Sequence, residues 1–428
     1  MSIEMPRSTA QRTTNPPTSS IQMTVPPGKT DSIAFTCLLG LMATLPGFGT
    51  DMALPALADT ATSLAVPVHS AGLTISSYMI SFGLAPLAFG PLSDRYGRQP
   101  VVALGSIIFV IASVGCALAP SLPVLIAFRI IQGIGAAAMT LAIAIARDTF
   151  DDSVVRQKLS NIVMAIYVSP IAAPMVGAAL LQLTSWRAIY ASLAALGILL
   201  LIGLRFGPDY GRKPRPTARF SLLALVGDYR SVLSHPTCRA YLFAAAASFG
   251  VLAAYATGSA LFLVQVAGLS STQYGIIFGL TAFAGMAGAF VDGRLNARGV
   301  PSHYSLSIGF TIQVLTSSVL LAMTLLNWTP TPIVILLFVM LTFSGGLAAP
   351  GLMQGALQQL PEMAGTVSAA TNSFVMISGS VTSALTAVLF DGRTALSMAG
   401  VMEFFSLLAL LFLTMAIGRV RQQALMSS

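Results

Sequence analysis

Three ionisable side chains lie inside long apolar runs of this sequence: Asp51, Arg129 and Glu403. If such a run crosses a membrane, a charge inside it is expensive, so each group is a candidate for function. On a helix, Asp51 is expected about 9 Å from the nearer end of its run and Arg129 about 12 Å from the nearer end of its own. At this similar depth the two could face one cavity and form an ion pair, which would reduce the cost of placing both charges in the membrane. Burial and a nearby guanidinium have opposite effects on a carboxyl, which would let Asp51 load and release a proton.

Each of these groups also has a plainer interpretation. Asp51 could be a helix-end acid that is already in water. Arg129 could be a structural arginine whose donors are satisfied by backbone carbonyls. For Glu403, in the last apolar run, a structural or interfacial role is favoured. The three histidines lie in or near predicted loops, and none is expected to relay protons.

The composition indicates a polytopic membrane protein. Of 428 residues, 55% are hydrophobic and 8% are charged, whereas about a quarter of an ordinary soluble domain is charged. The 22 basic and 14 acidic residues cannot cover the surface of a soluble protein of this length. This excludes disorder and a soluble enzyme. The three cysteines are odd in number and far apart, so neither a disulfide scaffold nor a metal site is suggested.

Twelve apolar runs are long enough to cross a bilayer as helices. We expect them at 33–57, 70–91, 101–119, 121–146, 159–183, 188–206, 241–267, 273–291, 304–326, 331–354, 364–390 and 396–418. Of the 22 Lys and Arg residues, 19 fall in the tails and in alternate connections, which by the positive-inside rule places both termini in the cytoplasm. The remaining three are Arg187 and Arg393 in the opposite loops and Arg129 within a run.

The polar interruptions divide the chain into five parts. Residues 1–32 are rich in Pro, Ser and Thr and are expected to be a disordered cytoplasmic tail. Residues 33–206 form a first six-helix bundle, 207–240 a cytoplasmic linker, 241–418 a second six-helix bundle and 419–428 a cytoplasmic C-terminus. Asp94 and Asp292 follow the second and eighth runs, 198 residues apart, which favours two parallel repeats.

The segment from Gly90 to Pro100 reads GPLSDRYGRQP. Its glycines permit a tight turn, and its acid can accept hydrogen bonds from a helix N-terminus or pair with arginines. The segment resembles the loop motif of the major facilitator superfamily between helices 2 and 3. The resemblance implies a latch that holds the two halves together on the cytoplasmic side; the alternative is a basic turn that only sets topology. The implied latch residues are Gly90, Asp94, Arg95, Gly97, Arg98 and, from the end of the fourth run, Asp148.

Two further motifs of the same superfamily occur in the first half. Arg129-Ile-Ile-Gln132-Gly-Ile-Gly matches its helix 4 motif. The fifth run contains a diluted form of its antiporter motif, in which alanines replace two glycines; the residues that fit are Pro170, Pro174 and Gly177. Small residues and prolines there allow close, bent packing of helices.

The sequence DMALPAL that begins at Asp51 is similar to a motif of the Bcr/CflA drug-resistance subfamily, and stretches of the second half are similar to the same subfamily. The resemblance implies a fold with a central cavity between two bundles. Several aromatic, Met and amide side chains fall in the runs that line this cavity in the family, although core packing is the more frequent role for any one of them. These cavity candidates are Tyr78, Gln132, Met164, Tyr167, Phe249, Tyr255 and Phe283.

We therefore expect an all-α protein with two six-helix bundles that exports small drugs or hydrophobic metabolites in exchange for protons across the bacterial inner membrane. No phosphate-binding loop and no nucleophile–base pair is present, so the driver is expected to be the proton motive force without a cofactor, and an enzyme is not expected. The expected partners are a small-molecule substrate, protons and the bilayer, with no nucleic acid, and the chain is expected to be a monomer. One alternative is export of a specific metabolite, such as an amino acid or a sugar. The other is a membrane sensor without transport.

Overall fold

The computed structural model describes residues 33–150, 152–206 and 222–427, and in these ranges the chain forms helices and connections but no strand. The first half contains α2 (Ile33–Asp51), η1 (Leu54–Ala56), α3 (Leu57–Ser63), α4 (Val68–Ala71), α5 (Leu73–Leu84), α6 (Pro86–Tyr96), α7 (Arg98–Leu118), α8 (Leu122–Ala137), η2 (Ala138–Leu141), α9 (Ala142–Thr149), α10 (Asp152–Leu183) and α11 (Trp186–Phe206). The second half contains α12 (Leu222–Ser234), α13 (Pro236–Leu261), the π-helix η3 (Phe262–Val266), α14 (Ser271–Ala297), α15 (Ser302–Leu325), α16 (Thr331–Leu357), η4 (Pro361–Met363), α17 (Ala364–Val388) and α18 (Leu396–Ser427).

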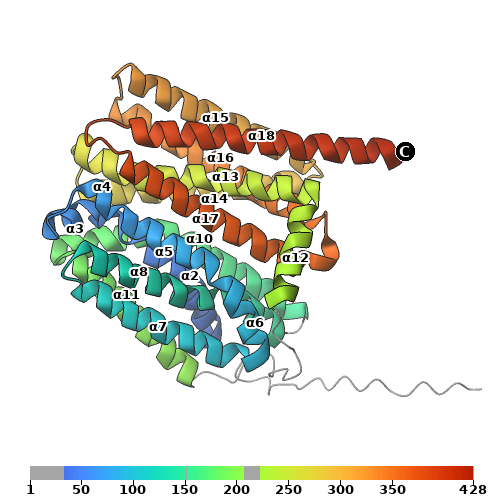
Figure 1. The fold of residues 1–428 in the computed structure, drawn as a ribbon, viewed down its shortest axis with the longest axis horizontal. Coiled ribbons are helices and arrows are strands. Elements are labelled where there is room, and N and C mark those ends of the chain that lie inside the picture. The colour runs from blue at the N-terminus through green and yellow to red at the C-terminus, as the bar shows by residue number, and fades with distance from the viewer. Residues whose placement is uncertain (1–32, 151, 207–221, 428) are drawn as a thin grey trace, which may run out of the picture.

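Eleven helical segments of the described chain are long and apolar enough to cross a membrane. They coincide with eleven of the twelve predicted runs, from Ile33–Ser63 to Leu396–Val420. The remaining run is α17, which lies among the long helices of the second half in Figure 1 but is less apolar. Nine of its 25 residues are serine or threonine. A helix packed mainly against protein can carry these hydroxyls because other helices, rather than lipid, surround it.

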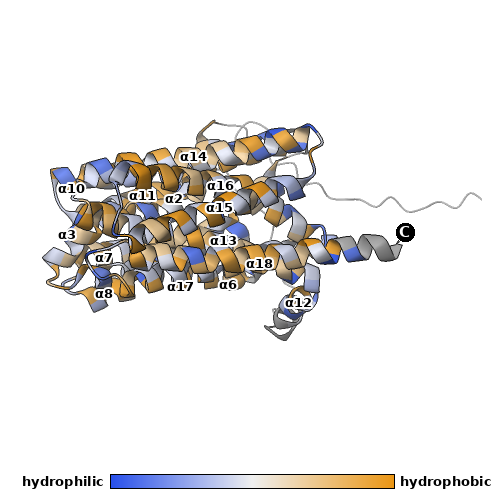
Figure 2. Ribbon diagram, turned by 90° about the horizontal axis from the view of Figure 1, so that it is seen from above, coloured by the Kyte–Doolittle hydropathy of each residue, from blue (hydrophilic) through white to orange (hydrophobic). Residues whose placement is uncertain are grey.

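Apolar residues predominate along the lengths of the helices and hydrophilic residues gather near their ends, as Figure 2 shows. Large apolar side chains such as Ile111, Leu199, Leu315 and Phe404 are about half exposed or more. In water such a surface would be unstable, but lipid hydrocarbon is as apolar as these side chains. The distribution confirms a multi-pass membrane protein.

The long helices run side by side, with the first half below and the second half above in Figure 1. Within the first half α7 packs on α8 and α11, α5 packs on α8, and α2 packs on α10. Within the second half α13 packs on α17 and α18, and α16 packs on α14 and α15. The halves meet along two seams, α5 with α17 and α10 with α14.

The segment between the halves differs from the featureless linker predicted at 207–240. Helix α12 occupies Leu222–Ser234 and packs against α17 and α13 (Figure 1). Helix α13 already begins at Pro236, where the His235 side chain accepts a hydrogen bond from the Cys238 N–H at 3.3 Å and so caps the first turn. At the other end of the chain, α18 continues as a helix to Ser427, through most of the segment predicted as a separate C-terminal tail.

Two turns, one with Arg187 and one with Asp391, are held by hydrogen bonds. Arg187 donates to the Ala119 carbonyl at 3.0 Å and to the Ser63 hydroxyl at 3.3 Å, so it ties together the ends of α3, α7 and α11. Before α18, the Asp391 carboxylate accepts from Thr394 Oγ1 at 2.6 Å and from two backbone N–H groups. Its slight burial opposes ionisation, but these hydrogen bonds outweigh that effect and lower the pKa of Asp391.

Candidate functional site

The side chain of Arg129, on α8, is fully buried in the first half. Its Nε donates to the Thr74 carbonyl of α5 at 3.1 Å, and its Nη1 donates to the Gly49 carbonyl of α2 at 2.7 Å. Nη1 also donates to Gln132 Oε1, one turn further along α8, at 2.7 Å. Backbone carbonyls therefore accept hydrogen bonds from two nitrogens of the guanidinium, which agrees with the structural alternative stated for Arg129.

Two tyrosine rings complete the surroundings of the guanidinium. Its carbon lies 4.3 Å from the centre of the Tyr78 ring and 5.7 Å from that of Tyr190 on α11, and ring faces attract a cation more strongly when water is excluded. The Tyr78 hydroxyl donates to the Pro46 carbonyl at 2.8 Å, which fixes the ring. Among the described residues Arg129 Nη2 has no hydrogen-bond partner, although it is buried. One strong donor of the site is thus unused.

Two further hydrogen bonds hold Gln132 in place. Its Nε2 donates to the Ser113 hydroxyl of α7 at 2.8 Å, and that hydroxyl donates in turn to the Phe109 carbonyl at 2.6 Å. The network around Arg129 therefore joins α2, α5, α7, α8 and α11. Neither Ser113 nor Tyr190 was predicted from the sequence, because a lone serine or tyrosine in an apolar run carries no motif.

Asp51 is the last residue of α2, where the helix breaks before η1. Pro55 follows within the motif and cannot donate a backbone N–H, so a residue of the motif itself accounts for the break in the helix. The carboxyl is half-buried. It is close enough to Tyr78 of the first half and to Tyr255 and Tyr274 of the second half to interact with them electrostatically. Asp51 therefore lies where the two halves meet.

The predicted ion pair between Asp51 and Arg129 is wrong for this conformation. No contact of 4.0 Å or less joins their charged atoms. Among the described side chains, the ion pair is the one between Arg98 and Asp148. The guanidinium of Arg129 donates instead to the carbonyl of Gly49, which lies on α2 two residues before the acid. A role of both residues in proton coupling stays a prediction.

The predicted cavity residues differ in how far they are buried. Tyr78 and Gln132 belong to the Arg129 network, and Tyr255 is buried in the second half, where its hydroxyl shares a hydrogen bond of 2.5 Å with Thr281. Phe249 is partly buried. The others carry exposed rings or thioether on α10 and α14: Met164, Tyr167 and Phe283.

The helix 5 motif lies where α10 packs against its own half and where it packs against the other half. Gly177 faces the backbone of Met52, next to Asp51, so closely that a Cβ atom there would clash with the Met52 carbonyl. Pro174, one turn earlier, lies beside Gly275 of α14, whose added Cβ would be 3.2 Å from the Pro174 carbonyl. Pro170 and Pro174 both lie inside the helix. The motif thus brings α10 against the site in its own half and against the other half.

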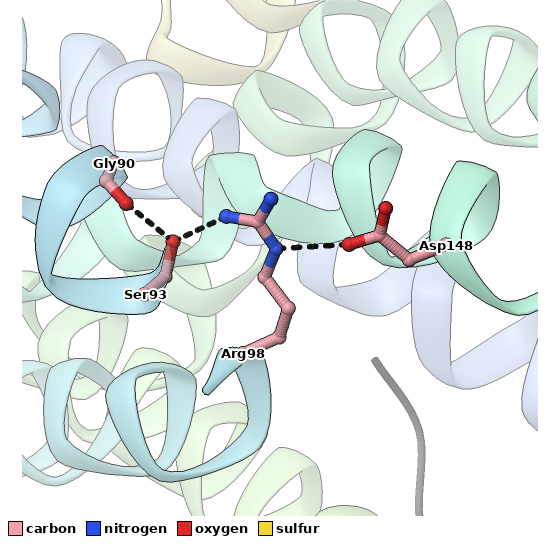
Figure 3. A network of polar contacts seen from close by, with 4 residues as sticks. All are labelled: Gly90, Ser93, Arg98 and Asp148. Carbon is pink, nitrogen blue, oxygen red and sulfur yellow. Dashed lines mark hydrogen bonds and ion pairs between the residues drawn. The ribbon is translucent and has the colours of Figure 1, made fainter. Parts of the chain in front are cut away.

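The loop motif forms a polar network between α6, α7 and α9. Arg98 Nε donates to Asp148 Oδ2 at 3.1 Å, and Arg98 Nη1 donates to the Ser93 hydroxyl, which donates to the Gly90 carbonyl at 2.7 Å (Figure 3). Gly97, between the two helices, has a φ of 94°, which glycine adopts without strain.

The predicted latch also includes Arg95 and Asp94. Arg95 is exposed, and its guanidinium lies 5.3 Å from the centre of the neighbouring Tyr96 ring. The side chain of Asp94 lies outside the described residues. The hydrogen bonds drawn in Figure 3 all lie within the first half, so the part of the motif described by the structure braces that half.

Two halves of long apolar helices that meet along two seams, with a charged side chain buried in one half, are typical of a polytopic membrane transporter. The sequence profile of the Major Facilitator Superfamily matches residues 39–383. The chain belongs to this superfamily.

Several relatives match over most of the chain, and they confirm the resemblance to the Bcr/CflA drug-resistance group. A bicyclomycin resistance protein homolog of Haemophilus influenzae is 27% identical over 89% of this chain and 96% of its own length. Multidrug resistance protein D of Escherichia coli is 30% identical over 78% and 84%. A chloramphenicol resistance protein of Pseudomonas aeruginosa is 31% identical over 78% and 79%.

Solved structures show the same fold. The POT family transporter PepTSo superposes with a TM-score of 0.71 at 15% identity, over 92% of this chain and 98% of its own. The xylose transporter XylE of Escherichia coli, in a partially occluded inward-open conformation, superposes with a TM-score of 0.67 at 16% identity, over 89% and 96%. Family and fold are those of transporters, so the chain is a transporter and not an enzyme. No group of three or more metal-ligating side chains occurs among the residues that were placed.

Proposed function

We propose that this transporter exports small, largely apolar drugs or hydrophobic metabolites in exchange for protons. The drug-resistance names of its relatives support the substrate class. The exposed Met164, Tyr167 and Phe283 on α10 and α14 are consistent with it, because thioether and aromatic side chains adapt to varied apolar ligands.

The observation that most favours proton coupling is the placement of Asp51. It is an acid without an ion-pair partner at the seam between the halves, near Tyr78 of one half and Tyr255 and Tyr274 of the other. A charge at such a seam acts on both halves, so adding a proton changes the relative free energies of two arrangements of the halves. Arg129 is the fixed positive charge of the site, and its unused Nη2 could receive the carboxylate or the substrate in another conformation.

Alternating access would follow from opening and closing the two seams. Residues that meet across them include Gly72 with Ala387, Gly83 with Met376, and Gly275 with Pro174. In the proposed cycle the seams separate to release substrate on the outer side, while the proton motive force rather than a nucleotide supplies the energy.

The proposed location is the inner membrane of a bacterium, with both termini in the cytoplasm. The excess of Lys and Arg on one side of the spans supports this orientation. We propose a monomer as the working unit, since the substrate path is formed between two halves of one chain.

Export of a specific metabolite is the second candidate, because the fold serves many substrates and the site is only partly polar. The deciding experiment is an efflux assay in a host without its own efflux pumps. Cells that express the chain are compared with cells that express Arg129→Ala, using chloramphenicol, bicyclomycin, lipophilic cations, amino acids and sugars. Resistance and lower accumulation of the first compounds would support drug export. Selective release of one amino acid or sugar, without resistance, would replace it with the metabolite exporter.

A further inference from the structure

A pocket unrelated to the Arg129 site opens in the second half, at the ends of α13, α15, α16 and α18 that are predicted to be cytoplasmic. Its volume is about 370 Å³, within the usual range of about 300–1,000 Å³ for small-molecule pockets. The seams between the halves are formed by α5 with α17 and by α10 with α14, so this pocket lies within one half and away from the seams. It also lies at the opposite end of the helices from Asp51.

The polar groups of the pocket favour an anion. None of its ten lining residues is acidic. Its polar side chains are all of types that can donate hydrogen bonds, and they are Tyr241, Ser302, His303, Gln354 and Gln358. The Ser302 hydroxyl already donates to Gln354 Oε1 at 3.2 Å, which leaves the Gln354 amide N–H groups to donate elsewhere. Ser302 and His303 are also the first two residues of α15, a helix of 24 residues. The backbone N–H groups in the first turn of a helix have no partner within it and carry partial positive charge.

Tyr241 supplies a donor without a partner. This residue is 8% exposed, and its ring packs against Gly355, where an added Cβ would lie 2.6 Å from a ring carbon. The backbone of α16 therefore fixes the direction of the ring. The Tyr241 hydroxyl forms no hydrogen bond with any residue that the structure describes, although the residue lines the pocket. The residue is mostly buried but its hydroxyl is not among the buried polar atoms without a partner, so the hydroxyl is open to the pocket and available to donate to a ligand there.

The remaining walls indicate what the anion is attached to. Leu306, Ile417 and Val420 line the same pocket, and Gln354, Gln358 and Val420 are exposed, so it is open to the surroundings. Arg419 lies between two of the lining residues in the sequence of α18 without lining the pocket itself, and its Nη1 donates to the Pro236 carbonyl at 2.6 Å. Donors beside apolar walls at the ends of membrane-spanning helices match the phosphate and upper acyl chain of an anionic lipid.

We infer that this pocket binds the phosphate of an anionic phospholipid, with the Tyr241 hydroxyl and the Gln354 and Gln358 amides as donors. The bound lipid joins the ends of four helices of the second half. This inference is independent of the proposed drug export.

The test uses the full-length protein in nanodiscs that contain equal amounts of phosphatidylglycerol and phosphatidylcholine, with retained lipids counted by native mass spectrometry. The wild-type protein should retain phosphatidylglycerol preferentially. Tyr241→Phe keeps the ring and removes the donor, and it should weaken this preference by about tenfold, as expected for one hydrogen bond to a charged group. Gln354→Leu should act in the same direction. Ser307→Ala, which removes a hydroxyl bonded only within α15, is the matched control and should leave the preference unchanged.

Two results of the nanodisc experiment would overturn the inference. One is equal retention of the two lipids by the wild-type protein. The other is an unchanged preference in both Tyr241→Phe and Gln354→Leu. A third arm measures the melting temperature in detergent with inorganic phosphate or with short-chain phosphatidylglycerol. Protection by inorganic phosphate alone would assign the pocket to a free anion and refute the lipid. Protection by phosphatidylglycerol that is lost in Tyr241→Phe supports it.

Discussion

The hydroxyl of Ser76 on α5 donates to the hydroxyl of Ser383 on α17 at 3.1 Å, across 307 residues of sequence and across the seam between the halves. Ser383 also shares a hydrogen bond of 2.7 Å with Thr257 of α13, and Ser380 donates to the Ser76 carbonyl at 2.8 Å. All four residues are buried. Since small residues let the two helices approach closely, these hydroxyls hold the seam shut in this conformation.

Ser383→Ala should favour opening of the α5–α17 seam. It removes a hydroxyl that serves two partners, and a hydrogen bond contributes about 1 kcal/mol, so the open fraction should rise by about fivefold. The measurement is the rate at which an impermeant maleimide labels a cysteine placed at Ala387, which faces Gly72 across the seam. Ser77→Ala is the matched control on α5, because that hydroxyl bonds only to Thr74 of its own helix. Equal labelling rates in Ser383→Ala and Ser77→Ala would refute the prediction.

Asp51→Asn should stop uphill export that is driven by a pH gradient, because an amide cannot carry the proton. Substrate binding and downhill exchange should continue, since the amide is similar in size and polarity to the acid. Efflux is measured in energised vesicles with and without an imposed pH gradient. Asp59→Asn, an exposed acid eight residues further along, should behave as the wild type. If Asp51→Asn still accumulates substrate against its gradient with ΔpH as the energy source, the proton site is elsewhere, and Glu403 is the next candidate.

Arg129→Ala should abolish both uphill and downhill transport. The change leaves the carbonyls of Gly49 and Thr74 and the Gln132 oxygen without their donor, and each unpaired buried group costs about 1–3 kcal/mol. The melting temperature in detergent should fall as well.

Arg129→Lys tests geometry separately from charge. An ammonium cannot reproduce the fork that reaches α2, α5 and Gln132 together, so export should fall by about tenfold or more with less loss of stability than in Arg129→Ala. Arg298→Lys, an exposed change of the same kind at the end of α14, should have no effect. Full export by Arg129→Lys would show that only the charge matters.

Asp148→Asn should slow transport while membrane insertion stays normal. It removes the charge that Arg98 pairs with in the network of Figure 3, a partly buried ion pair worth about 1 kcal/mol, so export should fall by about fivefold. Arg95→Ala should have a smaller effect, because Arg95 is exposed and contacts its neighbour Tyr96. Equal losses for both variants, measured at equal membrane expression, would contradict this assignment.

The proposed orientation predicts that Ala65 is reached from outside the cell and Ala297 from the cytoplasm. Both positions are exposed at opposite ends of the spans, Ala65 in a connection and Ala297 at the end of α14. Single cysteines are introduced there in a Cys37→Ser background, since Cys37 is the exposed native thiol. An impermeant maleimide should label position 65 in intact cells and position 297 only after permeabilisation. Labelling of position 297 in intact cells would reverse the topology.

The sequence by itself determined the class of protein and its helices. Membrane helices must satisfy their own backbone hydrogen bonds and must be apolar over a fixed length, so runs of residues such as 101–119 and 396–418 specify them locally. The loop motif likewise specified a turn at Gly97, because the turn depends on adjacent residues. The resemblance to the superfamily placed Asp148 in the same predicted latch as Arg98, with which it pairs in the structure. The one weak signal was α17, whose many hydroxyls hide its apolarity.

The partners of Arg129 and the seam at Ser383 were decided only by the tertiary structure. Sequence reasoning paired the two opposite charges Asp51 and Arg129, since pairing lowers the cost of burial. It could not foresee that the break of α2 would offer a backbone carbonyl at Gly49, because every residue type carries the same carbonyl. The contact of Ser76 with Ser383 depends on how two separate bundles meet. The apolar pattern of a helix says which face is buried, but not which hydroxyl of a distant helix it will meet there.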